Sequence, residues 1–161
     1  MALSITSTEF GDHAPIPALY TCDGENLAPP IGWSGPPPHT ASFALIVDDP
    51  DAPDPAAPKR TFVHWVVWEI PAAVRELAEG GTLPDGAREG RNDDGGTGYT
   101  GPCPPIGRHR YFFKLYALDA TLGNLQSPTK ADLERAMEGH VLDRAEIVGT
   151  YAREGRGGRG R

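Results

Sequence analysis

The stretch from Gly101 to Asp119, GPCPPIGRHRYFFKLYALD, constrains the fold of this chain more than any other. It begins with prolines, which lack the N–H that a strand ladder needs, and continues into aromatic and aliphatic residues typical of a buried strand. We therefore expect a stiff loop that leads directly into a core strand. Alternate side chains of a strand share a face. The expected faces are His109, Tyr111, Phe113 and Leu115 on one side, and Arg110, Phe112, Lys114 and Tyr116 on the other.

Residues 43–70, FALIVDDPDAPDPAAPKRTFVHWVVWEI, predict two further core strands joined by an acidic, proline-rich loop. The first strand ends near Asp49 and Asp51, and the second carries His64 among aliphatic and aromatic residues. Two histidines, His64 and His109, thus stand on core strands beside carboxylates and proline-rich loops. This pattern predicts one shared polar pocket.

The rest of the chain adds short apolar runs separated by irregular links. Helical spacing of apolar residues, with Thr129 as a cap, predicts a helix over Thr129–Val141, and a helical turn is expected over Ala72–Leu77. Residues 80–100, rich in Gly, Asp and Asn, predict one long loop. The predicted strands are Leu3–Ser7, Ala18–Cys22, Ala41–Val47, Phe62–Ile70, Arg110–Leu118 and Ala145–Tyr151.

This order of elements favours antiparallel sheets packed face to face over an alternating βαβ array. The expected fold class is mainly β, a β-sandwich of two antiparallel sheets with one or two short helices. At 161 residues the chain is long enough for a single core. We expect one domain over residues 1–153, followed by a disordered basic tail, rich in Gly and Arg, over 154–161.

The charge pattern argues against two classes of function. The formal net charge is −7, although the segment from Arg153 to Arg161 holds four arginines and one glutamate, so the remaining chain is still more acidic. An acidic body is a poor binder of nucleic acid or anionic membranes. The longest apolar run, Phe62–Ile70, is too short to span a bilayer, and Met1–Phe10 lacks the features of a signal peptide. We expect a cytoplasmic protein that neither binds nucleic acid nor inserts into membranes.

The two cysteines, Cys22 and Cys103, are too few for a disulfide framework and lack the spacing of zinc ligands. Free thiols are the expectation for a cytoplasmic protein. A bridge between them stays open as an alternative, because both lie in loops that lead to the predicted pocket.

The predicted pocket has the chemistry of an anion site. A phosphate needs donors and positive charge, and His64 and His109 would supply both if Asp49 or Asp51 raised their pKa values. Tyr111 adds a hydroxyl, and backbone amides around the 107 position add donors. Because bare carboxylates repel phosphate, we expect the aspartates to orient the histidines rather than to touch the ligand.

Two rival functions use the same residues. Asp49, Asp51, His64 and His109 would suit Zn²⁺ or Mn²⁺ if they converged, but none forms a local ligand motif. Histidine and aspartate could also run the acid and base chemistry of a hydrolase. However, no GxSxG motif is present, and Cys103 lies between prolines without an evident base. The expectation is therefore no metal, no cofactor and no catalytic residue.

Four segments together resemble one known family. They are DPDAP at 49–53, the strand with His64, GPCPPIGRHRY at 101–111, and AMEGHVL with IVGTYAR near the end. In this order, over most of residues 3–153, they resemble the phosphatidylethanolamine-binding protein family, and specifically its bacterial Raf kinase inhibitor-like branch.

The resemblance implies a β-sandwich with a small anion pocket at one end. Family members bind phosphate, phosphorylethanolamine or related anions, some inhibit kinases or proteases, and a homodimer is implied by resemblance alone. Eukaryotic members continue into a helix that borders the pocket, whereas this chain ends in a basic tail, which implies a more open pocket. The loop over residues 80–100 has no close match, so partner surfaces are not carried over. The implied ligand-binding residues are Asp49, Asp51, Pro53, His64, Gly101, Pro102, His109 and Tyr111.

Overall fold

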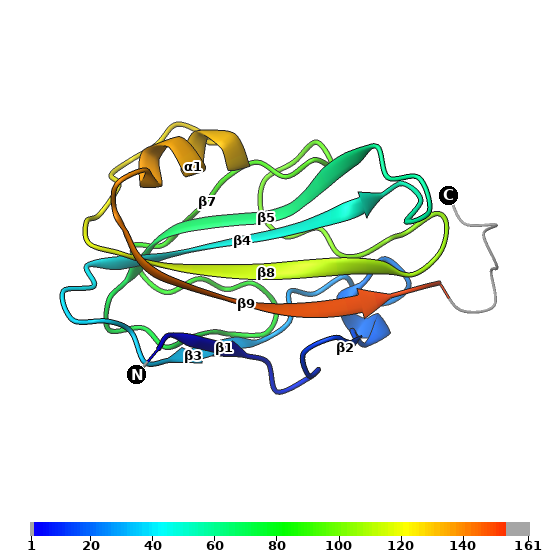
Figure 1. The fold of residues 1–161 in the computed structure, drawn as a ribbon, viewed down its shortest axis with the longest axis horizontal. Coiled ribbons are helices and arrows are strands. Elements are labelled where there is room, and N and C mark those ends of the chain that lie inside the picture. The colour runs from blue at the N-terminus through cyan, green and yellow to red at the C-terminus, as the bar shows by residue number, and fades with distance from the viewer. Residues whose placement is uncertain (1, 154–161) are drawn as a thin grey trace.

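The computed structural model describes residues 2–153, which form two β-sheets, one α-helix and one short 3₁₀ helix (Figure 1). The predicted tail over residues 154–161 lies outside the described part. The strands are β1 (Ser4–Thr6), β2 (Ala14–Pro15), β3 (Ile31–Ser34), β4 (Ser42–Ala52), β5 (Arg60–Pro71), β6 (Glu76–Leu77), β7 (Arg88–Glu89), β8 (His109–Leu118) and β9 (Val141–Tyr151). The helices are η1 (Ala18–Tyr20) and α1 (Lys130–Met137).

The larger sheet has six strands in the order β2-β9-β8-β4-β5-β7, and the smaller has three in the order β1-β3-β6. The long neighbours β5, β4, β8 and β9 all pair antiparallel, as predicted. The exception is β2, whose two residues run parallel to the end of β9. The close approach of Ile16 to the bare backbone of Gly149 leaves no room for a side chain at that position. The larger sheet is therefore mixed rather than purely antiparallel.

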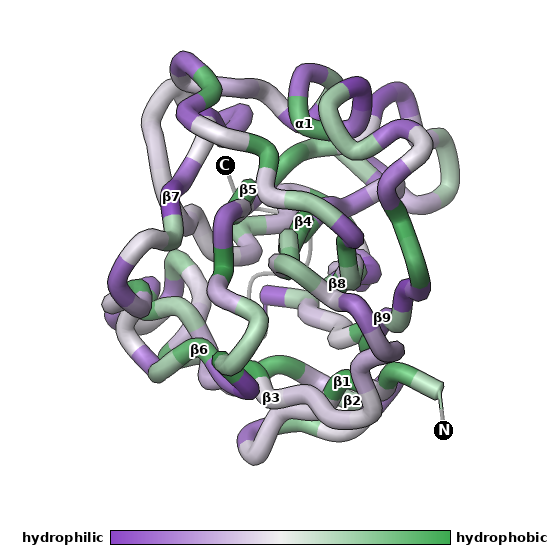
Figure 2. The backbone as a smooth tube through the Cα atoms, turned by 90° about the vertical axis from the view of Figure 1, so that its left-hand side faces the viewer, coloured by the Kyte–Doolittle hydropathy of each residue, from purple (hydrophilic) through white to green (hydrophobic). Residues whose placement is uncertain are grey.

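The two sheets pack face to face around one apolar core, as predicted for a β-sandwich (Figure 2). The Trp33 ring of β3 lies 5.4 Å from the Phe43 ring of β4, between their centroids. The opposite face of the larger sheet is covered at one end by α1, whose Leu133 and Met137 pack against buried residues of β4 and β5. Figure 2 shows these three layers with α1 above the larger sheet and the smaller sheet below it.

Strand β8 confirms the alternation predicted for it. His109, Tyr111 and Phe113 are buried on the face toward the smaller sheet, whereas Arg110 is exposed and Lys114 is half-buried on the other face. Hydrophobic burial on one face therefore sets the register of the strand, because a slip of one residue would expose that whole set.

Several local predictions are wrong. Residues 18–22 contain η1 instead of a strand, because the Thr21 amide and hydroxyl both donate to the Ala18 carbonyl and close a turn. Residues 72–77 contain β6 instead of a helical turn, because Leu77 is buried against β3. The long loop over residues 80–100 contains the short strand β7, which pairs with β5.

Helix α1 begins as predicted and ends earlier than predicted. Thr129 and Asp132 form a reciprocal capping box at its start. Its last residue is Met137, since Glu138 leaves the helical conformation and Gly139 has a positive φ of 82°. Val141 then starts β9 instead of ending the helix. Among residues 2–153, no helix is long and apolar enough to cross a membrane.

Candidate functional site

A cavity of about 490 Å³ lies at the end of the sandwich where β4 finishes and β5 and β8 begin. Two proline-rich loops, over residues 53–59 and 101–108, flank it, and they approach so closely that a side chain at Gly107 would press against Pro55. The cavity is lined by Cys22, Asn26, Asp49, Ala52, Pro53, Arg60, Phe62, His64, Asp94, Thr100, Gly101, Cys103, Pro104, Pro105, His109 and Tyr111.

Six of the eight predicted ligand-binding residues line this cavity, namely Asp49, Pro53, His64, Gly101, His109 and Tyr111. Asp51 and Pro102 do not line it. Of the lining residues that the sequence analysis missed, Phe62 had a usable signal, because it lies two residues before His64 and so shares its face of a strand. Asn26, Asp94 and Thr100 lie in loops, where no periodicity reports which way a side chain points.

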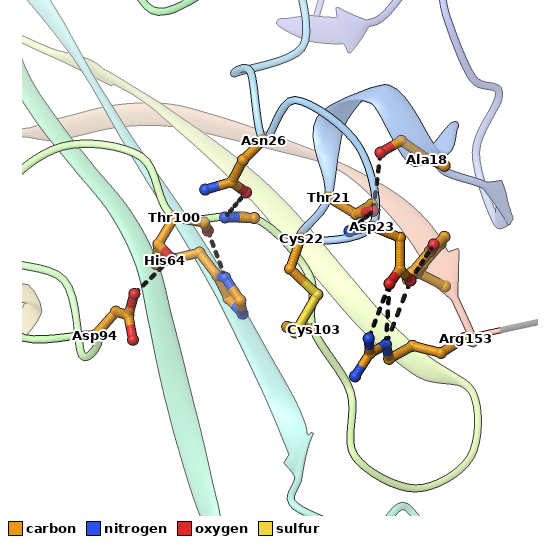
Figure 3. Close-up of a disulfide and its surroundings, with 12 residues drawn as sticks. Ala18, Thr21, Cys22, Asp23, Asn26, His64, Asp94, Thr100, Cys103 and Arg153 are labelled. Atoms are coloured by element: carbon orange, nitrogen blue, oxygen red, sulfur yellow. Dashed lines mark hydrogen bonds and ion pairs between the residues drawn. A yellow bond between two sulfur atoms is a disulfide. The ribbon is translucent and has the colours of Figure 1, made fainter. Parts of the chain in front are cut away.

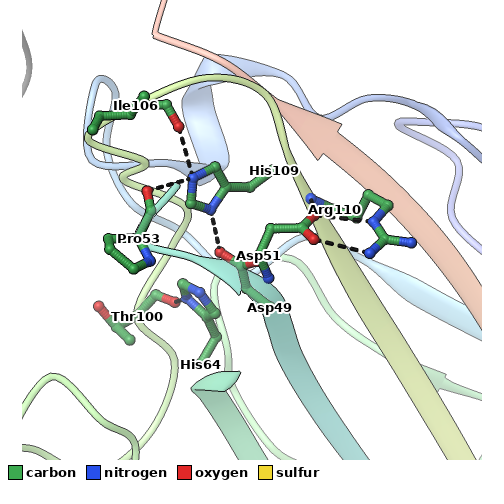
Figure 4. Close-up of polar contacts among 8 residues, drawn as sticks. All are labelled: Asp49, Asp51, Pro53, His64, Thr100, Ile106, His109 and Arg110. Atoms are coloured by element: carbon green, nitrogen blue, oxygen red, sulfur yellow. Dashed lines mark hydrogen bonds and ion pairs between the residues drawn. The ribbon is translucent and has the colours of Figure 1, made fainter. Parts of the chain in front are cut away.

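His109 forms a buried ion pair with Asp49 (Figure 4). Its Nδ1 lies 2.6 Å from Asp49 Oδ2, and its Nε2 lies 3.0 Å from the Pro53 carbonyl and 2.9 Å from the Ile106 carbonyl. Carbonyls only accept hydrogen bonds, so Nε2 carries a proton. The Asp49 carboxylate is also an acceptor, so Nδ1 carries a second proton. The arrangement is that of an imidazolium whose donors are all used within the protein. The prediction that His109 donates to the ligand is therefore not supported by this geometry.

Burial alone would lower the pKa of His109, but the hydrogen bond and the charge of Asp49, with the two carbonyls, outweigh burial and raise that pKa above its ordinary value. The charge of Asp49 is thereby balanced within the protein. Asp49 lies where the prediction that it orients and charges a histidine requires it to be, in contact with His109.

We expect the two cavity histidines to differ in charge at neutral pH, with His109 positively charged and His64 neutral. Because the folded pKa of His109 is raised, its contribution to stability is complete below the unfolded value of about 6.5 and is lost as pH rises through the folded value. Burial lowers the pKa of His64, so its contribution is complete above about 6.5 and is lost as pH falls through the folded value. Nitrogen NMR of labelled histidine across this range reports the charge of each ring. A neutral His109 ring at pH 7 would contradict the assignment.

Asp51 pairs with Arg110 instead of a histidine. Its carboxylate accepts from the Arg110 backbone amide at 2.9 Å, from Nε at 3.0 Å and from Nη2 at 2.9 Å. The hydrogen bond from Arg110 is the main reason that the pKa of Asp51 is lowered. Arg110 lies on the face of β8 opposite to His109. The predicted role of Asp51 in orienting a pocket histidine is wrong, and its role is to hold Arg110.

His64 and Tyr111 lie beside each other in the cavity wall, with 5.2 Å between their ring centroids. His64 Nδ1 lies 2.7 Å from the Thr100 carbonyl, so this nitrogen carries the proton, and Nε2 of the neutral ring is an acceptor. The Tyr111 side chain is only 1% exposed, and its hydroxyl has no hydrogen-bond partner among the described residues. Burial raises the pKa of Tyr111, so its hydroxyl stays protonated and able to donate.

The cysteines are paired, and the expectation of free thiols is wrong. Cys22 and Cys103 form a disulfide with their Cα atoms 5.4 Å apart. Their separation of 81 residues gives no local spacing signal, so only the folded chain shows that they meet.

A second, larger depression of about 860 Å³ lies between the loop over residues 91–97 and the start of α1. Two of its polar side chains already have partners: Lys130 binds Asp48, and the Asn92 side-chain amide donates to the Gly98 carbonyl. Among residues 2–153, no group of three or more His, Cys, Asp or Glu side chains is placed to hold a metal ion. The smaller cavity is thus the stronger candidate site.

The fold and the cavity together define a β-sandwich protein with a partly enclosed cavity, lined by charged, polar and apolar side chains, at one end of its sheets. The chain belongs to the phosphatidylethanolamine-binding protein family, whose family model matches residues 6–152.

Similar proteins support this assignment. A UPF0098 protein of Methanothermobacter thermautotrophicus is 48% identical, over 94% of this chain and 99% of that protein. A phosphatidylethanolamine-binding protein homologue from Chlamydia trachomatis, whose crystal structure is solved, is 40% identical in sequence to this chain. The two structures superpose with a TM-score of 0.89, over 95% of this chain and 99% of that one. YbcL of Escherichia coli is 33% identical, with a TM-score of 0.86 over 96% of this chain and 100% of that one.

Proposed function

We propose that the protein binds a small phosphate-bearing anion in the cavity without changing it chemically. The observation that carries this proposal is the Tyr111 hydroxyl, which is buried in the cavity wall without a partner among residues 2–153. An unsatisfied buried polar group costs about 1–3 kcal/mol. A ligand oxygen that accepts from Tyr111 would recover this cost, and phosphate oxygens are strong acceptors.

The two cations that line the cavity, His109 and Arg60, match the charge of its two carboxylates, Asp49 and Asp94, so the lining carries no net negative charge against an anion. The His109 imidazolium balances Asp49, so this carboxylate does not repel a negative ligand as a bare one would. Arg60 lines the cavity, lies 3.3 Å from Asp93 between the charged atoms, and has a side chain that is 54% exposed. A pair this exposed contributes about 1 kcal/mol or less, so Arg60 is available to a competing anion. Neutral His64 would accept from a phosphate oxygen that carries a proton.

The same geometry favours binding over catalysis. Both nitrogens of His109 donate to protein acceptors, which leaves that ring no lone pair to act as a general base. His64 keeps a lone pair on Nε2, but burial lowers its pKa, which makes it a weak base. The sulfur of Cys103 is part of a disulfide and is not a thiolate nucleophile. Sustained hydrolysis of a phosphomonoester that disappears in a Tyr111→Phe variant would favour a hydrolase instead.

A Tyr111→Phe variant tests the proposed function. We expect wild-type protein to bind inorganic phosphate and phosphorylethanolamine saturably in calorimetric titrations, and the variant to bind about tenfold or more weakly, because a hydrogen bond to a charged acceptor contributes about 1.5–3 kcal/mol. The unliganded variant should be at least as stable as wild type, since it loses a hydroxyl that has no partner.

The matched control is Tyr116→Phe. Tyr116 lies on the same strand, on the opposite face of the sheet, and packs near α1. Its loss of a hydroxyl should leave phosphate affinity unchanged. No saturable binding to wild type at millimolar phosphate, or equal affinity in the two variants, would contradict the proposal.

The cavity rim suggests that a partner protein, such as a kinase or protease, presents the anion. Ile106 lies in the loop before β8, beside the cavity, and is 44% exposed. A phosphorylated segment could place its phosphate in the cavity and an apolar residue on Ile106. Capture of such a partner that millimolar phosphate releases would support this, and indifference to phosphate would count against it.

A further inference from the structure

The disulfide forms part of the cavity wall (Figure 3). Cys22 follows η1 in the loop over residues 21–30, and Cys103 lies in the loop before β8. Both cysteines line the cavity and both are partly exposed. A small solute that enters the cavity therefore meets these two residues, unlike the cysteines of a disulfide buried in a core.

The loop that carries Cys103 is held at its two ends by other contacts. At its start, Gly101 N donates to Asn26 Oδ1 at 2.8 Å, and Cys22 N donates to the Pro102 carbonyl at 3.1 Å. At its far end, the Ile106 carbonyl accepts from His109. Between these anchors, Pro104 and Pro105 have no N–H to donate. The disulfide is thus the covalent tie of the middle of the loop to the opposite wall.

We infer that the Cys22–Cys103 disulfide is a redox modification site that sets the anion affinity of the cavity. This inference rests on the anion binding proposed above. With the disulfide intact, the cavity wall is already ordered before the ligand binds, so binding loses little conformational entropy. After reduction the wall is mobile, and ordering it when the ligand binds subtracts from the binding free energy. The contacts at the ends of the loop keep the reduced protein folded while its cavity loosens.

The reductant is a small thiol or dithiol. Its thiolate attacks one cysteine sulfur, the Cys22–Cys103 bond breaks, and a mixed disulfide forms as the other cysteine leaves as a thiolate and takes up a proton. A second thiolate then displaces the bound cysteine, which is protonated in turn. The cysteines gain two electrons and two protons, and the reductant leaves as its own disulfide. Exposed disulfides are the ones that thiols reduce readily.

The test compares phosphate binding by oxidised wild type, by wild type reduced with dithiothreitol, and by a Cys22→Ser/Cys103→Ser variant with and without dithiothreitol. We expect reduction of the folded protein to weaken phosphate binding about tenfold, which corresponds to about 1.4 kcal/mol. The phosphate affinity of the variant should equal that of the reduced wild type and should not change when dithiothreitol is added. Circular dichroism of each sample checks that it is folded, and reduced wild type decides the matter if the variant does not fold.

The possible results separate the two proposals. Equal affinity of oxidised and reduced wild type, or a disulfide that dithiothreitol reduces only after unfolding, would overturn the redox inference and leave anion binding intact. Absence of phosphate binding by the oxidised protein would overturn both. Faster hydrogen exchange of the Cys103 and Ile106 amides after reduction, without a change elsewhere, is the expected sign that the wall itself has loosened.

Discussion

Replacing Asp49 by alanine is expected to lower the free energy of unfolding by about 3–5 kcal/mol, the usual cost of removing one partner of a buried ion pair. The side chains of His109 and Asp49 are 1% and 4% exposed, so water does not replace the lost carboxylate. The Asp51 amide, which donates to Asp49 Oδ1 at 2.7 Å, also loses its acceptor. Urea unfolding followed by fluorescence measures the effect.

The pH dependence of this variant gives a second signature. In wild type the contribution of the pair is present at low pH and is lost as pH rises through the raised pKa of His109. Without the hydrogen bond and the charge of Asp49, the pKa of His109 falls, so the loss of stability on raising the pH should become smaller and begin at lower pH. Unfolding curves at several pH values test this directly.

Asp51→Ala is the matched control, because it makes the same change two residues away. Asp51 is itself buried, with a side chain that is 8% exposed, but its partner Arg110 is 52% exposed and can be hydrated when the carboxylate is lost. We expect this variant to lose much less stability than Asp49→Ala and to keep phosphate binding. Equal losses in the two variants would show that burial of the His109 pair does not set the cost.

Removal of the disulfide is expected to cost about 4 kcal/mol of stability. The bridge closes a loop with a sequence separation of 81, and constraining a loop of this size in the unfolded chain is worth between about 3 and 5 kcal/mol. Guanidinium unfolding of the Cys22→Ser/Cys103→Ser variant against oxidised wild type measures the difference. Since domains have stabilities of about 5–15 kcal/mol, the variant should still fold.

The control for this experiment is the same variant in the presence of dithiothreitol. Because the variant has no disulfide to reduce, it should unfold at the same denaturant concentration with and without dithiothreitol. A loss of less than about 1 kcal/mol in the variant would mean that the oxidised chain gains little from loop closure, through strain or through residual structure in the unfolded state.

The core strands could be predicted from the sequence because each carries its own signal. The alternation of β8, with His109 and Tyr111 on the buried face, follows from a period of two and is confirmed. The apolar runs of β4 and β5 likewise show where the chain is buried on both faces. The short elements could not be predicted in this way: β6 is a strand because Leu77 packs against β3, which is a contact between distant segments.

The two aspartates of β4 show that strand periodicity does not always predict the face on which a side chain lies. Asp49 and Asp51 are two residues apart, so a regular strand would place both on one face. The strand is irregular between Asp49 and Ala52, and this changes which way Asp51 points. Asp49 therefore charges a buried histidine, whereas Asp51 holds Arg110 on the other face of the sheet.

The sequence by itself determined the family, through the motifs that it shares with other members. It also determined the two-sheet fold and the end of the sandwich at which His64, His109 and Tyr111 gather, because burial and strand periodicity are local properties of the chain. Only the tertiary structure decided that His109 has no donor left, that the Tyr111 hydroxyl has no partner within the described residues, and that Cys22 meets Cys103. Hydrogen-bond partners and disulfide pairs depend on distances between segments far apart in the chain, and no spacing along the sequence reports these distances.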